Sequence, residues 1–340
     1  MNKKSIIIAV ILAVGGIVGF NYYQKIFAKN VVKDGVIFIK SDDDIYEVKR
    51  AVTPFIKNIN DFDFVVQKKN YNKPKGGKYI LKEGMSNNTI VNLLRSGNQT
   101  PVKVSFNNQD TLEKLAGRIA AQIEPDSISL LTIMKDATFL AENKFTKTAV
   151  LGMYLPNSYE FYWNTSAENF RNKMLREYNR FWNEDRLDKA KKLNLSKEQV
   201  IALASIVQKE TARISERPIV AGLYLNRYKK GWPLQADPTI IYMLKQQYGQ
   251  DFVVKRVLTK DLEIKSPYNT YLNKGLPPTL IAMPDISSID AVLNPSAHDY
   301  FFMCASVDKI GYHEFAKTLA QHNRNATKYQ RWADLQGINR

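Results

Sequence analysis

Glu210 is the side chain in this sequence whose type and surroundings point most directly to catalysis. It lies in the run 204–211, which reads Ala-Ser-Ile-Val-Gln-Lys-Glu-Thr. On an α-helix, with about 100° of rotation per residue, Glu210 falls beside Leu203 and Val207 on an apolar face. A carboxylate that is buried, ionised and unpaired costs several kcal/mol, so the group tends to keep its proton. A carboxyl with a raised pKa is suited to act as a general acid near neutral pH.

The helix that would position this acid has a clear beginning in the sequence. Ser196 is a typical N-cap, and Gln199 follows three residues later, at the spacing of a capping box. The apolar face is then formed by Val200, Leu203, Ala204 and Val207. Lys209 and Glu216 are expected to point the other way. The alternative is an acid at the edge of the core that reaches solvent or pairs with Arg213.

Length, composition and charge bound the class of protein. The 340 residues have room for two domains or one large domain, and a hydrophobic content of 44% excludes a disordered chain. The net charge of +16 favours an anionic partner such as nucleic acid, a membrane surface or an acidic polymer. The charge is spread along the chain, so a solvated basic surface is the simplest interpretation.

The sequence offers neither a disulfide nor a metal site. The single cysteine, Cys304, lies in the apolar run 300–305 and is expected in a buried strand. His298, His313 and His322 lack the tight spacing of metal ligands. We therefore expect no metal and no cofactor.

The amino-terminal segment resembles a membrane anchor in composition. Lys3 and Lys4 precede the almost wholly apolar stretch Ser5–Phe20, and Tyr22 and Tyr23 follow where they can sit at a membrane interface. A cleaved signal peptide is the alternative, but no convincing cleavage site follows the apolar stretch. The two lysines predict a cytoplasmic N-terminus, with the rest of the chain outside the cytoplasm. That placement argues against nucleic acid as the partner.

Residues 36–106 have the pattern of a small α+β module. The expected strands are Val36–Ile39, Phe62–Gln67, Lys78–Lys82 and Val102–Phe106, and the expected helix is Asn88–Arg95, ended by Gly97. The module has no cluster of acidic, cysteine or histidine side chains that could do chemistry. A binding or spacing role is therefore expected.

The rest of the chain alternates helical segments with polar, aromatic loops. The expected helices are Asp110–Ile123, the charged region Ala167–Lys192, the Glu210 helix, a helix capped by Ser215 that ends before Gly231, and a last helix from Gly311 to near Trp332. Asp237-Pro238 is a turn or a helix start. The loops at 149–163, 233–242, 266–271 and 275–278 suit carbohydrate, because hydroxyls bind planar amides and carboxylates while sugar faces stack on aromatic rings. For 149–163 the alternative is a hydrophobic lid over a core, and for each of the other loops alone turn formation is a sufficient explanation.

Four motifs in order resemble the endolytic murein transglycosylases of the YceG-like family. They are 204–211, Leu234–Thr239, Ser266–Tyr271 and Gly275–Pro278. The resemblance implies an α+β protein made of an N-terminal transmembrane helix, a small LysM-like α+β module and a larger mixed α/β catalytic domain. The implied divisions are a cytoplasmic tail at 1–4, the anchor at 5–24, the LysM-like module at 34–106 and the catalytic transglycosylase domain at 107–340.

The resemblance also implies an activity and its residues. Such an enzyme cuts peptidoglycan strands internally, between N-acetylmuramic acid and N-acetylglucosamine, and leaves 1,6-anhydro-muramyl ends. The family's catalytic residue is a glutamate of the run 204–211; many members have two acids there, but the first is Gln208 here, so Glu210 takes the role. The implied substrate-binding residues are Gln235, Asp237, Thr239, Tyr268, Asn269, Thr270, Tyr271 and His313. Departures at Asn157-Ser158, Ala236 and Thr279 bear on binding details.

The resemblance implies partners and a location as well. The partners are peptidoglycan glycan strands, the inner membrane and, as candidates, the peptidoglycan synthases whose nascent strands it would terminate. The catalytic domain would be periplasmic or extracytoplasmic. Two alternatives stay open: a hydrolytic muramidase in which Asp237 positions water, and a non-catalytic scaffold that binds peptidoglycan.

Overall fold

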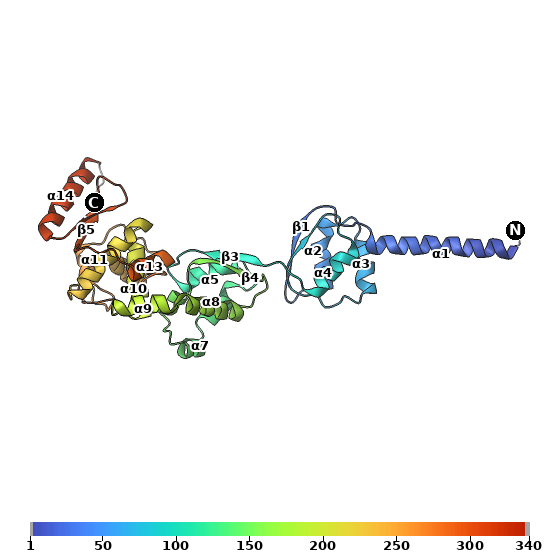
Figure 1. Cartoon of the computed structure of the whole chain (residues 1–340), viewed down its shortest axis with the longest axis horizontal. Coiled ribbons are helices and arrows are strands. Elements are labelled where there is room, and N and C mark those ends of the chain that lie inside the picture. Colours follow the sequence, from blue (N-terminus) through green and yellow to red (C-terminus); the bar gives the residue numbers. More distant parts are fainter. Residues whose placement is uncertain (1–2, 337–340) are drawn as a thin grey trace. The chain divides into compact units, whose positions relative to one another are not determined.

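The computed structural model describes residues 3–336 of a mixed α+β chain (Figure 1). It divides into two compact units. The first comprises Met1–Val104, Ile119–Asp126 and Ser158–Ala167, and the second comprises Ser105–Arg118, Ser127–Asn157 and Glu168–Arg340. Residues 1–2 of the expected cytoplasmic tail and 337–340 of the expected catalytic domain lie outside the described residues.

Helix α1 (Lys3–Phe27) is long and apolar enough to cross a membrane, with a mean hydropathy of 2.1 over its most apolar stretch. None of its residues is buried. By length and composition it is compatible with a membrane anchor or a signal sequence. Its last turns meet the module that follows: the ring of Tyr22 lies 4.9 Å from that of Phe64, and the Asn87 side-chain amide donates to the carbonyl of Lys25 at 2.8 Å.

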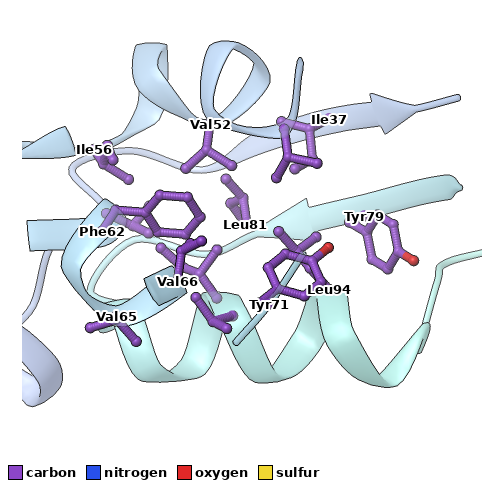
Figure 2. Close-up of a cluster of buried hydrophobic side chains, with 14 of the residues drawn as sticks. Ile37, Val52, Ile56, Phe62, Val65, Val66, Tyr71, Tyr79, Leu81 and Leu94 are labelled. Carbon is purple, nitrogen blue, oxygen red and sulfur yellow. The ribbon is translucent and has the colours of Figure 1, made fainter. Parts of the chain in front are cut away.

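The amino-terminal module is a two-stranded antiparallel sheet covered by helices. Its elements are β1 (Gly35–Ile39), α2 (Ile45–Val52), η1 (Thr53–Phe55), α3 (Ile59–Lys68), β2 (Gly77–Leu81) and α4 (Asn87–Ser96). β1 pairs with β2 so that Ile37 lies opposite Tyr79. Figure 2 shows Val52, Phe62 and Leu81 pointing toward one another from three elements of this core. The module therefore has a hydrophobic core of its own.

The prediction of a strand at Phe62–Gln67 is wrong, because this segment lies in the helix α3. The side-chain oxygen of Asn58 caps the helix by accepting from the N–H groups of Asn60 and Asp61. Phe62, Val65 and Val66 are buried at helical spacing. A short apolar run fits the period of a helix as well as that of a strand, and here the N-cap at Asn58 favours the helix.

The positions of the other expected strands and of the expected helix are confirmed. The strands expected at 36–39, 78–82 and 102–106 correspond to β1, β2 and β3 (Val102–Phe106), and the helix expected at 88–95 corresponds to α4. Gly97 ends α4 with a left-handed φ of 73°, which favours glycine. β3 forms a second two-stranded sheet with β4 (Asn157–Phe161).

Helices dominate the rest of the chain. In order these are α5 (Leu112–Ala120), α6 (Ser127–Met134), α7 (Ala137–Glu142), η2 (Val150–Met153), α8 (Ala167–Phe181), α9 (Glu184–Lys192), α10 (Lys197–Glu210), η3 (Ile214–Glu216), α11 (Arg217–Lys229), α12 (Asp237–Tyr248), η4 (Thr259–Glu263), α13 (Ile286–Leu293) and α14 (Leu319–Leu335). The strands β5 (Phe302–Ala305) and β6 (His313–Ala316) form an antiparallel pair before α14. α10 packs against α11, α12 and α13.

Three expectations for this part change. The last helix begins at Leu319, because residues 313–316 pair with β5 as a strand and Thr318 caps α14. Ser215 lies in η3 and does not cap α11, whose N-cap position is Glu216. Cys304 is half-buried rather than buried.

The burial of Phe62 yields a stability prediction. Its ring is fully buried in the module core, so Phe62→Ala should destabilise the protein by about 3–5 kcal/mol. Tyr46→Ala is the control, because Tyr46 is 68% exposed, and its effect should stay within about 0.5 kcal/mol. Urea unfolding of the two variants measures both values. Equal effects would contradict the packing described here.

Candidate active site

Glu210 is the last residue of α10, and the beginning of this helix is as predicted. The hydroxyl of Ser196 accepts from the N–H of Gln199 at 3.2 Å, and the Gln199 side chain accepts from the N–H of Ser196 at 2.9 Å. Every residue from 200 to 207 is buried. The middle of α10 is thus packed on all sides, and the half-buried Glu210 lies at its carboxyl end.

Glu210 opens into a pocket of about 240 Å³. Its wall is built from α10, α11, the start of α12, the loop before α13, and the strands β5 and β6. The lining residues are Glu210, Leu223, Tyr224, Arg227, Gln235, Asp237, Tyr271, Met303, Cys304, Ala305 and His313. Segments up to about a hundred residues apart in sequence thus meet around one acid.

Burial raises the pKa of Glu210 to about 7. The hydroxyl of Tyr224 donates a hydrogen bond to the Glu210 carboxyl and lowers this pKa, as do the nearby His313 and Arg227. The charge of Asp237 acts in the opposite direction. Because the largest effect is burial, the carboxyl is close to half protonated at neutral pH, which suits a group that must give and then take a proton.

Arg227 is the buried cation of the site. Its guanidinium donates to the carbonyls of Phe301 at 2.7 Å and Leu234 at 2.6 Å. These bonds tie α11 to the segment before β5 and to the loop before α12. Arg227 therefore fixes the backbone around the pocket while its charge favours the ionised form of Glu210.

A helix that continued past Glu210 would direct Glu216 away from the apolar face, and this was the expectation. In the structure Glu216 is instead buried, with 4% of its surface exposed. The reason is that α10 ends at Glu210 and the chain turns back through η3. The Glu216 carboxylate accepts from the hydroxyl of Thr211 at 2.9 Å and from the backbone N–H of His313 at 2.6 Å. One of its oxygens also lies 3.0 Å from His313 Nδ1. Glu216 thus fixes the ring of His313 at the edge of the pocket.

The structure brings half of the predicted substrate-binding residues to the pocket. Gln235, Asp237, Tyr271 and His313 line it together with Glu210. Gln235 has a left-handed φ of 52°, and its N–H donates to the carbonyl of Thr270 at 2.9 Å. The hydroxyl of Tyr271 donates to the carboxylate of Asp237. Asp237 is the first residue of α12 and not its N-cap, which is Ala236.

The other four predicted residues do not line the pocket. Thr239 and Thr270 are buried, and their hydroxyl oxygens lie 2.9 Å apart. Asn269 is buried as well, and its amide donates to the carbonyls of Leu262 and Ile264. Tyr268 has its ring 4.9 Å from that of Tyr242. These side chains organise the loop that carries Tyr271, and a contact with substrate stays a prediction for them.

Sequence reasoning missed Tyr224, Arg227 and Glu216. Tyr224 and Arg227 lie three residues apart on α11, and this spacing was the available signal, since it places both on one helix face. Glu216 had no such signal, because its partner His313 is 97 residues away.

The side chain of Gln208 has a structural role, since it joins two helices. Its side-chain oxygen accepts from the N–H of Asp285 at 3.1 Å and from the hydroxyl of Ser288 at 2.8 Å. These bonds fasten the end of α10 to the beginning of α13. Within residues 3–336, no group of three or more His, Cys, Asp or Glu side chains could hold a metal ion.

Known proteins resemble this chain in sequence and in fold. The YceG-like family model matches residues 37–328, and the chain belongs to that family. The "endolytic murein transglycosylase" of Bacillus subtilis is 31% identical over 290 residues, which cover 81% of this chain and 78% of that protein.

Two further relatives extend the comparison. A protein of Streptococcus pneumoniae with the same name is 25% identical over 94% of this chain, which spans 63% of the pneumococcal protein. A crystal structure of a YceG-like protein from Listeria monocytogenes superposes with a TM-score of 0.57 and 29% identity, covering 86% of this chain and 98% of that one.

The raised pKa of Glu210 predicts a pH-dependent stability. The folded pKa of about 7 exceeds the ordinary value of 4.5, so ionisation destabilises the folded state as pH rises between these values. Glu210→Gln should therefore stabilise the protein by about 3 kcal/mol at pH 8 and by little near pH 4.5. Thermal unfolding at both pH values measures this, with the exposed Glu263→Gln as control. A pH-independent effect of Glu210→Gln would contradict the shifted pKa.

Proposed function

We propose that the chain is an endolytic peptidoglycan lytic transglycosylase with Glu210 as its general acid and base. The chain is then an enzyme of the lyase type, and its substrate is the glycan strand of peptidoglycan. The observation that carries the proposal is a glutamic acid with a pKa of about 7 in a polar pocket. The relatives named as endolytic murein transglycosylases support the reaction class.

The reaction needs one acid because the substrate supplies the nucleophile. Protonated Glu210 gives its proton to the glycosidic oxygen as the bond from that oxygen to C1 of N-acetylmuramic acid breaks. The resulting carboxylate then takes the proton of the C6 hydroxyl of the same sugar while its oxygen attacks C1. The new C1–O6 bond leaves a 1,6-anhydro end, and Glu210 is protonated again. The attack is intramolecular, so orientation supplies much of the rate.

The neighbours of Glu210 suit both protonation states. The Tyr224 hydroxyl, Arg227 and His313 stabilise the carboxylate formed halfway through the reaction, whereas burial favours the acid that begins it. Asp237 and Tyr271, joined by a hydrogen bond, line the same pocket and present polar groups to the sugar ring. Ordinary glycosidases use two carboxylates with separate roles. The second carboxylate in this pocket is Asp237, which accepts from the hydroxyl of Tyr271, and the proposed reaction assigns it no proton transfer.

The same proposal covers location and organisation. The apolar helix α1 anchors the protein in the inner membrane with its N-terminus in the cytoplasm, and residues 107–340 act outside the cytoplasm. Residues 34–106 are a LysM-like module that binds glycan or sets the distance of the site from the membrane. The net charge of +16 suits anionic lipid and stem-peptide carboxylates. Termination of nascent strands would place peptidoglycan synthases among its partners.

Mass spectrometry of muropeptides released from purified sacculi tests the reaction. The wild-type protein should release internal fragments with 1,6-anhydro ends. Glu210→Gln should lower the rate by at least about a hundredfold, because glutamine cannot give up a proton to the leaving oxygen. Circular dichroism of the variant checks that it is folded.

Other products would identify the alternatives. Fragments with hydrated reducing ends, heavier by one water, would make the protein a muramidase and turn attention to Asp237. Binding to sacculi without release, unchanged in Glu210→Gln, would make it a non-catalytic scaffold.

The contact between Glu216 and His313 predicts coupled losses of activity. Glu216→Gln should lower kcat about 10–100-fold with little change in KM, because the ring of His313 loses its charged partner and its fixed orientation. His313→Ala should have a similar effect, and the double variant should lose no more than either alone. Steady-state kinetics of the three variants measure the coupling. Losses that multiply in the double variant would show that the two residues act independently.

A further inference from the structure

A polar surface lies along α12, the helix whose first residue, Asp237, lines the catalytic pocket. The inner face of this helix is packed, since Ile240, Met243 and Leu244 belong to a hydrophobic cluster with the segment 254–271. On its outer face Ile241, Tyr242 and Lys245 are half-buried, and the ring of Tyr242 lies 4.9 Å from that of Tyr268, which belongs to the same cluster. There Pro238, Ile241, Tyr242 and Lys245 line a pocket of about 100 Å³ together with Asp110, Lys209, Gln250 and Ile281.

This pocket and the catalytic pocket take wall residues from the same two helix ends. Lys209 of α10 and Pro238 of α12 line this pocket, whereas their chain neighbours Glu210 and Asp237 line the catalytic one. Beyond it lies a pocket of about 590 Å³ that shares four of its residues: Asp110, Tyr242, Gln250 and Ile281. The two outer hollows thus extend from the beginning of α12 to just past its end. With about 1.5 Å of rise for each of its 12 residues, α12 spans about 18 Å.

The walls of the large pocket carry polar groups that nothing in the described chain satisfies. Gln246, Gln250 and Lys147 line it, and their side chains have no hydrogen-bond or ion-pair partner among residues 3–336. Other charges on the wall are already paired: Lys135 contacts Glu113 at 2.5 Å, and Asp110 contacts Lys209 at 2.6 Å. The unpaired groups are therefore two planar amides and one cation, beside the ring of Tyr242.

We propose that this groove, defined as the two pockets along the outer face of α12, is a second substrate site that holds the glycan strand beyond the bond that is cut. The inference rests on the proposed function and assigns the groove to that function's substrate. The amides of Gln246 and Gln250 hydrogen-bond to hydroxyl and acetamido groups of the sugars, and the Tyr242 ring packs against a sugar face. Lys147 supplies a cation where the strand carries carboxylates. A strand held along this groove enters the catalytic pocket by its interior, which makes the cut endolytic.

Strand binding to the full-length protein in detergent tests the groove independently of catalysis. The background is Glu210→Gln, so that strands are not consumed, and the probes are a long uncrosslinked glycan strand and a tetrasaccharide of the same repeat. Gln246→Ala with Gln250→Ala should raise the Kd for the long strand about tenfold, because two amide hydrogen bonds are lost. The Kd for the tetrasaccharide, which we assign to the catalytic pocket, should stay within about twofold.

Gln247→Ala is the matched control. Gln247 lies beside Gln246 on α12 and is equally exposed, but it does not line the groove. An unchanged Kd in the double variant, an equal loss with Gln247→Ala, or no binding of the long strand at all would overturn the groove. Failure of the proposed reaction has a different signature, since the wild-type protein would then bind long strands with the groove's dependence on Gln246 and Gln250 but release no 1,6-anhydro ends.

Discussion

The structure around the active site depends on keeping one carboxylic acid in a place where its charge is disfavoured. Glu210 ends α10, where the carbonyl ends of the helix add a negative potential to the effect of burial. Tyr224, Arg227 and His313 oppose this tendency and bring the pKa to about 7. Without them the acid would hold its proton too firmly to take part in a cycle of donation and acceptance. The balance therefore requires residues from α11 and β6 as well as α10.

Such a balance requires a rigid support, and α10 supplies it by being buried on all sides. A helix without a solvated face is unusual outside a large core, and here neighbouring helices cover it on several sides. Polar residues inside this packing serve as fasteners: the hydroxyl of Ser205 accepts from the N–H of Ile281, and Gln208 binds the start of α13. Both contacts at position 208 need an acceptor oxygen, which a glutamine amide supplies as a carboxylate would, and this explains how the site tolerates glutamine there.

The sequence was sufficient where the determining interactions are local. The capping box of α10, the stop at Gly97 and the apolar face below Glu210 all depend on residues within a few positions of one another, and all are found in the structure. It was insufficient where distant segments meet. The role of Glu216 depends on His313, which lies 97 residues later in the chain. Because α10 ends at Glu210, Glu216 is buried and does not lie on the solvent side of a longer helix, as was expected. β6 was likewise mistaken for the start of a helix because its pairing partner β5 lies elsewhere in the chain.

The polar loops show why residue types alone could not select the binding residues. Asn269, Thr270 and Thr239 have the chemistry of a carbohydrate site, yet their hydrogen bonds are used within the protein, where a buried loop must satisfy its own backbone groups. A side chain can bind a ligand only with the donors and acceptors that folding leaves unused. By this criterion substrate recognition shifts away from the buried half of the loop. We expect it to depend on the exposed Gln235 in the catalytic pocket and, in the proposed groove, on the free amides of Gln246 in the last turn of α12 and Gln250 just past its end.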